Sequence, residues 1–141
     1  MFRTIVVGTN FSDTAEIALV KALDLARSNG ARLHVVTASP RSVPPASGSS
    51  AGASGGQWMG PDFQADIALE RTLERVGAGV VDVQQHTLAA DPGDAILNVA
   101  DDVGADLIVV GNKGMRRRVL GSVPNTVSHR ATCDVLIVQT S

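Results

Sequence analysis

Three glycines and a serine near the end of the chain have the spacing of an anion-binding loop. Gly111 and Gly114 bracket a tight turn after the apolar run 107–110, and Gly121 and Ser122 come just before a predicted helix. Glycines let backbone N–H groups approach a bulky anion, and a helix start adds unpaired donors and the positive end of a dipole. The same spacing suits an ordinary strand-to-helix connection, so spacing alone leaves both interpretations open.

Basic side chains accompany these glycines. Lys113 lies inside the turn, and Arg116, Arg117 and Arg118 come after Met115. A guanidinium group pairs well with phosphate, so Lys113, Arg116 and Arg117 are candidate phosphate contacts. A solvated basic patch explains them equally well, because three adjacent side chains cannot all point the same way.

Other chemistries find little support in the chain. It contains no G-x-x-x-x-G-K-[ST], no G-x-G-x-x-G and no G-x-S-x-G. Cys133 and three scattered histidines (His34, His86 and His129) lack the spacing of metal ligands. We therefore expect no catalytic residue, no metal site and no enzyme. His34 and Cys133 are interpreted as packed residues.

Length and composition predict one domain spanning residues 1–141. The net charge of -2 argues against a nucleic-acid partner, and no apolar run is long enough for a membrane span. A single cysteine rules out an internal disulfide and fits a reducing compartment, so we expect a cytoplasmic protein. Residues 39–60 are rich in Pro, Ser, Gly and Ala, which predicts a flexible loop within the domain.

Hydrophobic periodicity predicts strands that alternate with helices. The predicted strands are 4–7, 32–38, 81–85, 106–110 and 134–140. The predicted helices are 13–28, 62–76, one between Asp91 as N-cap and Gly104, and 123–130 with Ser122 as N-cap. This alternation is typical of a parallel sheet with right-handed crossovers, whose ligands lie beyond the carboxyl ends of the strands. If the first and fourth strands are neighbours, residues 8–12 and 111–122 converge on one cleft.

Several stretches of the chain resemble the universal stress protein family. They are IVVGTNFSDTAE from Ile5, LHVV from Leu33, DPGDAI from Asp91, DLIVVGNKG from Asp106, LGSVPNTVS from Leu120 and CDVLIV from Cys133. The resemblance implies an α/β fold: an open five-stranded parallel sheet in the order 3-2-1-4-5 with helices on both faces. This fold is Rossmann-like, of the adenine nucleotide alpha hydrolase kind.

The resemblance also implies a ligand, because nucleotide-binding members carry G-x2-G-x9-G-[ST] after the fourth strand. That motif holds the phosphates and ribose of ATP, and some relatives bind cyclic AMP instead. The positions that match nucleotide-binding positions of the family are Gly8, Thr9, Asn10, Val35, Gly111, Gly114, Gly121 and Ser122.

Two departures from the family pattern bear on that ligand. Only six residues separate Gly114 from Gly121, and Asn10 stands where an aspartate is usual. An amide still hydrogen-bonds a hydroxyl but brings no charge, so assistance by Mg²⁺ should be weaker.

The sequence hypothesis is a homodimeric regulatory or stress-response protein that binds an adenine nucleotide. The family resemblance implies a dimer. We predict that the fifth strand forms the interface, because an uncovered edge strand exposes unpaired backbone groups. The interface residues are Val135, Leu136, Ile137 and Val138. The alternative is a dimeric interaction module of the same family that binds no nucleotide. A third class, a slow ATP hydrolase, lacks an identified base.

Overall fold

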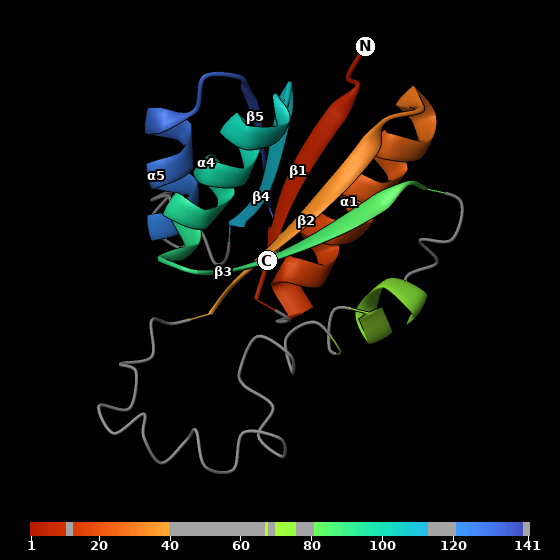
Figure 1. Cartoon of the computed structure of the whole chain (residues 1–141), viewed down its shortest axis with the longest axis horizontal. Helices are drawn as coiled ribbons and strands as arrows, with labels where there is room; N and C mark the ends of the chain where they lie inside the picture. The colour runs from red at the N-terminus through yellow and green to blue at the C-terminus, as the bar shows by residue number, and fades with distance from the viewer. Residues whose placement is uncertain (11–12, 40–66, 68–69, 76–80, 113–120, 140–141) are drawn as a thin grey trace.

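Five strands form one parallel sheet in the computed structural model, which describes residues 1–10, 13–39, 67, 70–75, 81–112 and 121–139. The sheet order is β3-β2-β1-β4-β5 (Figure 1). The strands are β1 (Thr4–Thr9), β2 (Arg32–Ser39), β3 (Val83–Ala89), β4 (Leu107–Asn112) and β5 (Asp134–Gln139). The predicted fold class and strand order are confirmed.

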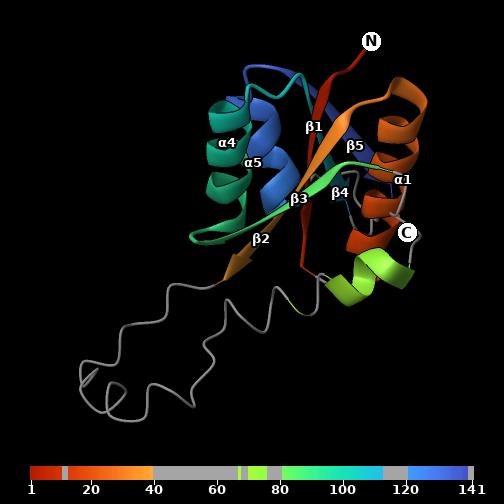
Figure 2. The same ribbon diagram turned by 45° about the vertical axis from the view of Figure 1, so that its right-hand side comes forward.

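Helices cover both faces of the sheet. On one face lie α1 (Asp13–Asn29) and the helical residues 70–75, and on the other lie α4 (Pro92–Val103) and α5 (Ser122–Arg130). Figure 2 shows the two helical layers with the sheet between them. The sheet is therefore the middle of three layers, and its central strands are removed from water on both sides.

The core follows from the alternation of side chains along β1 and β4. Ile5 and Val7 face α1, whereas Val6 faces α4 and α5, and all three are fully buried. Burial on both faces explains why these strands read as unbroken apolar runs. On α1 the buried stripe is Ala18, Leu19, Ala22, Leu23 and Ala26.

Capping residues set the ends of α4 as the sequence predicts. Asp91 is the N-cap, Pro92 opens the helix, and Gly104 ends it in the left-handed region at φ 66°. At α5 the prediction is wrong by one residue, because Gly121 is the N-cap and Ser122 is already helical. The central strands also run further than predicted, β1 to Thr9 and β4 to Asn112.

A carboxylate ties the amino ends of β1 and β4 together. Asp106 accepts hydrogen bonds from the backbone N–H groups of Arg3 (2.9 Å) and Thr4 (3.1 Å). The N–H of Asp106 in turn donates to the carbonyl of Thr4 at 3.0 Å. These bonds fix the register of the two strands before their first paired residues.

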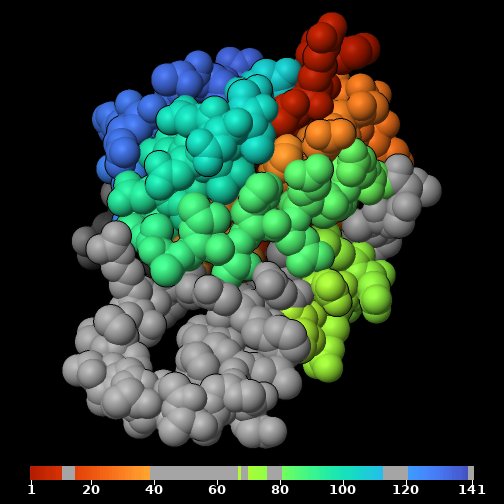
Figure 3. All heavy atoms as spheres, in the orientation of Figure 1, coloured from red at the N-terminus to blue at the C-terminus, as the bar shows by residue number. Residues whose placement is uncertain are grey.

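β3 and β5 are the edges of the sheet in the described part of the chain. In Figure 3, β3 lies along the surface beside α4. No helix among the described residues is long and apolar enough to cross a membrane. The predicted loop at 39–60 lies almost wholly outside the described residues.

Two histidines, buried His34 and half-buried His86, form a pair between β2 and β3. Nδ1 of His34 lies 2.8 Å from Nε2 of His86, and the two rings are 5.1 Å apart. His34 is 3% exposed, so its interpretation as a packed residue holds. Burial lowers the pKa of His34, and the neighbouring His86 and Arg32 lower it further, while Asp82 opposes the shift.

This shift makes stability depend on pH. Because the pKa of folded His34 is below its ordinary value of 6.5, the unfolded chain binds more protons as the pH falls through 6.5. We expect the melting temperature, followed by circular dichroism, to fall between pH 7.5 and pH 5.5. His34→Gln should flatten this dependence, whereas His129→Gln, a change at an exposed position of α5, should not. Equal slopes in wild type and His34→Gln would contradict the assignment.

Candidate functional site

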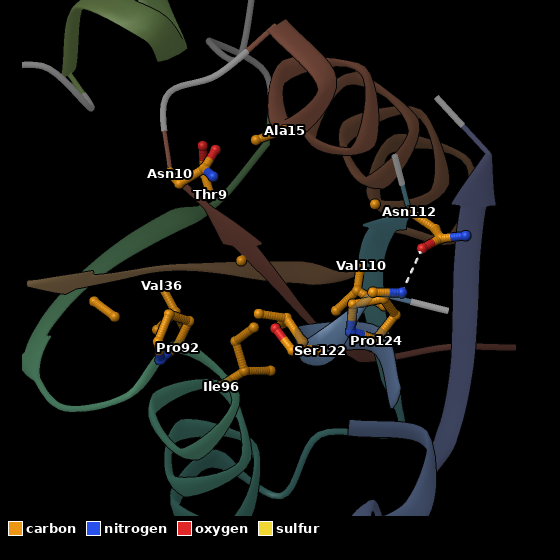
Figure 4. Close-up of a pocket in the computed structure, with 15 residues that line it drawn as sticks. Thr9, Asn10, Ala15, Val36, Pro92, Ile96, Val110, Asn112, Ser122 and Pro124 are labelled. Atoms are coloured by element: carbon orange, nitrogen blue, oxygen red, sulfur yellow. Dashed lines mark hydrogen bonds between the residues drawn. The ribbon is translucent and has the colours of Figure 1, made fainter. Parts of the chain in front are cut away.

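A cavity opens where the carboxyl ends of β1, β2 and β4 face the amino ends of α4 and α5 (Figure 4). Its volume is about 290 Å³. The lining residues among those described are Gly8, Thr9, Asn10, Ala15, Val36, Ala38, Pro92, Ile96, Val110, Gly111, Asn112, Gly121, Ser122, Val123 and Pro124. This is the edge at which ligands bind in open parallel sheets.

Splaying of the central strands accounts for the opening. β1 pairs with β4 only from Ile5 to Val7, although β1 continues to Thr9 and β4 to Asn112. Beyond that point the strands part, and Gly8 and Gly111 face the gap. A Cβ at Gly8 would lie 2.5 Å from Cδ1 of Ile96, so a larger residue would compete with the wall of the cavity.

One wall is apolar and comes from three elements. Val36 of β2, Ile96 of α4 and Val110 of β4 are each nearly inaccessible to solvent and belong to one core cluster. Figure 4 shows Val36 and Ile96 near each other and Val110 to their right, near Pro124. Such a wall suits a flat, weakly polar group such as a nucleobase.

Polar groups surround the rest of the cavity. Thr9 ends β1 and Asn10 follows it, Asn112 ends β4, and Ser122 begins α5. The N–H of Gly121 donates to Oδ1 of Asn112 at 2.9 Å (Figure 4). None of the described lining residues carries an ionisable side chain. At α4 the N-cap Asp91 and Asp94 of the first turn oppose the positive end of the helix dipole, whereas the first turn of α5 carries no acidic residue. The arrangement favours an anionic group at the amino end of α5.

Comparison with known proteins assigns the chain to a family. The model of the universal stress protein family matches residues 1–139. A universal stress protein of Mycobacterium tuberculosis strain H37Rv is 35% identical over 150 aligned positions, covering 99% of this chain and 98% of the relative.

The chain belongs to the universal stress protein family.

Two solved structures of universal stress proteins are similar to this one over nearly their whole length. One, in complex with cAMP, is 34% identical with a TM-score of 0.75, covering 99% of this chain and 98% of the other. The second, from Archaeoglobus fulgidus in complex with dAMP, is 27% identical with a TM-score of 0.69, covering 96% and 97%.

The structure of this universal stress protein brings most of the predicted site residues together. Lining the one cavity are Gly8, Thr9, Asn10, Gly111, Gly121 and Ser122. The predictions for Gly114 and for the phosphate contacts Lys113, Arg116 and Arg117 fall on positions outside the described residues. Nucleotide contact by any of these residues stays a prediction.

Val35 is not among the residues that line the cavity, which corrects its predicted place in the nucleotide pocket. It is fully buried in the cluster that faces α1, and its neighbour Val36 lines the cavity instead. The reason is the strict alternation of side chains along β2. Assigning Val35 to the α1 face together with Leu33 would have pointed to Val36 and Ala38. Ile96 and Asn112 were also missed, because a core-type position on a helix and a polar strand end give no distinctive pattern.

The free thiol of Cys133 does not line the cavity. Burial raises the pKa of the Cys133 thiol, and the neighbouring Asp134 raises it further, so the thiol form is favoured over the nucleophilic thiolate. Within the described ranges, no three His, Cys, Asp or Glu residues lie close enough together to hold a metal ion.

The contact between Gly8 and Ile96 can be tested by a double-mutant cycle. We expect Gly8→Ala to lower the free energy of unfolding by about 1–3 kcal/mol through overpacking. Ile96→Val, which removes Cδ1, should cost about 0.5–1.5 kcal/mol by itself. In the double variant the loss should be smaller than the sum by at least about 0.5 kcal/mol, measured by urea unfolding. Simple additivity would show that the two positions do not compete for space.

Proposed function

We propose that this universal stress protein binds one adenine nucleotide in the cavity and acts as a homodimeric regulatory or stress-response protein in the cytoplasm. The observation that carries the proposal is the convergence of Gly8, Asn10, Gly111 and Ser122 on one cavity beneath two helix amino ends. Similar proteins in complex with cAMP and dAMP support the choice of an adenine nucleotide.

Each part of such a ligand has a matching part of the site. The base fits the apolar wall, and the ribose hydroxyls fit Thr9 and Asn10. The phosphate fits the amino end of α5, where backbone N–H groups and the Ser122 hydroxyl gather. ATP and cyclic AMP are both candidates. Asn10 offers Mg²⁺ a neutral amide oxygen only, and the proposal includes no catalytic step.

Titration calorimetry with ATP, ADP, AMP, cyclic AMP and UTP tests the proposed ligand. We expect the adenine nucleotides to bind and UTP to bind at least tenfold more weakly. Ser122→Ala should weaken adenine nucleotide binding by about 0.5–1.5 kcal/mol, the usual value of one hydrogen bond.

A matched control lies on the same helix. Ser128 is exposed and donates its hydroxyl to the carbonyl of Asn125 at 3.1 Å, so Ser128→Ala should leave affinity unchanged. If no adenine nucleotide binds at millimolar concentration, the chain is the interaction module that binds no nucleotide.

Dimerisation through β5 is a separate prediction. The strand is a sheet edge, and its half-buried Val135, Leu136 and Ile137 make it an apolar one. Light scattering at micromolar concentration should give twice the 14.6 kDa of one chain. Ile137→Lys should yield a monomer because it places a charge within the half-buried apolar segment of the edge, while Gln139→Lys, at the exposed last position of the strand, should not. A monomeric wild type would reject this interface.

A further inference from the structure

Asn112 occupies an unusual position for an amide side chain. It is the last residue of β4, is 1% exposed, and forms part of the cavity wall. Its place at the end of β4, before the segment that leads to α5, puts it at the end of the cavity where the amino end of α5 lies.

The side chain of Asn112 supplies the helix with a cap from another element. Gly121 is the N-cap residue of α5 but has no side chain, and α5 forms no side-chain capping bond of its own. Oδ1 of Asn112 instead accepts the N–H of Gly121 at 2.9 Å. The two ends of the connection between β4 and α5 are thereby held together.

This bond decides which donors of α5 remain for an anion. Pro124 has no N–H, and the N–H of Asn125 donates to the carbonyl of Gly121 at 3.0 Å. With the N–H of Gly121 donated to Asn112, the first turn keeps the N–H groups of Ser122 and Val123, both residues of the cavity wall. These two groups lie next to the Ser122 hydroxyl.

We propose that Asn112 is the positioning residue of the anion end of the cavity, an inference that rests on the proposed nucleotide binding. Its amide holds Gly121 so that the N–H groups of Ser122 and Val123, and not that of Gly121, receive a phosphate group of the ligand. The absence of charge on the Asn112 side chain matters as much as its hydrogen bond to Gly121. A carboxylate at the same place would accept the same N–H but would put a negative charge beside the phosphate.

Asn112→Asp separates positioning from a purely structural role. The variant keeps the shape of the side chain and the acceptor for Gly121, but it places a carboxylate at a position that is 1% exposed, so its circular dichroism spectrum and melting temperature are compared with those of the wild type first. We expect the variant to bind AMP at least tenfold more weakly than wild type does, and its affinity for ATP to fall by a larger factor. Its affinity for adenosine should stay within twofold of the wild-type value. The loss should shrink as salt is raised.

Asn98→Asp on the exposed side of α4 makes the same chemical change away from the cavity, and it should leave all three affinities unchanged. Calorimetry measures each affinity.

NMR of the unaltered protein gives a second test that does not depend on a variant folding. The amide of Gly121 should be protected from hydrogen exchange both without ligand and with AMP. The amides of Ser122 and Val123 should become protected only when AMP is added.

Three outcomes overturn the inference. In one, Asn112→Asp binds AMP and ATP as wild type does. In another, AMP changes the amide of Gly121 more than those of Ser122 and Val123. In the third, wild type binds no adenine nucleotide, which rejects the proposed function as well and is thereby distinguishable from the other two.

Discussion

The short pairing of β1 with β4 is the contact on which both the fold and the cavity depend. β1 pairs with β2 along its whole length, but with β4 only from Ile5 to Val7. After β1 the chain turns into α1 on one face of the sheet, and before β4 it comes from α4 on the other face. Because Asp106 ties the amino ends together, the strands can separate only at their carboxyl ends. The separation produces the cavity.

Backbone groups, rather than charged side chains, give the described part of the cavity its electrostatic character. The walls carry amides, hydroxyls and aliphatic groups, and two helices point their amino ends at the opening. Helix termini keep their donors oriented without the rotamer entropy that a lysine or arginine would lose on binding. The cost is a dependence on precise helix placement, which the close approach of α4 to α5 provides. A Cβ at Gly93 would lie 3.0 Å from Cγ2 of Thr126, so a methyl group there would already crowd the other helix.

The sequence predicts the fold well because its signals are local. Apolar runs at 4–7 and 107–110 mark the central strands, and Gly30 and Gly104, both at positive φ, mark helix ends that only a residue without Cβ adopts easily. The strand order rests instead on family resemblance, since alternation of elements does not fix which strands are neighbours.

The candidate site is predicted less completely than the fold. Glycines and polar strand ends are visible in the sequence, and most of them line the cavity. Ile96 and Asn112 are not visible, because their roles arise from contacts between elements distant in the chain: Ile96 with Gly8, and Asn112 with the helix that begins at Ser122. Val35 shows the other limit, since an error of one residue along a strand moves a side chain to the opposite face.

Ile96 and Val36 also show that the proposed ligand site and the hydrophobic core share residues. Both belong to the core cluster beneath α4 and both form the wall of the cavity. A ligand seated on that wall buries surface that the folded chain alone leaves open, and it binds the folded state only, so it must stabilise the fold by mass action. Conversely, a substitution that loosens the wall weakens the core by the same contacts. The cavity is thus part of the hydrophobic core left open where β1 and β4 diverge, and not a separate structure added to it.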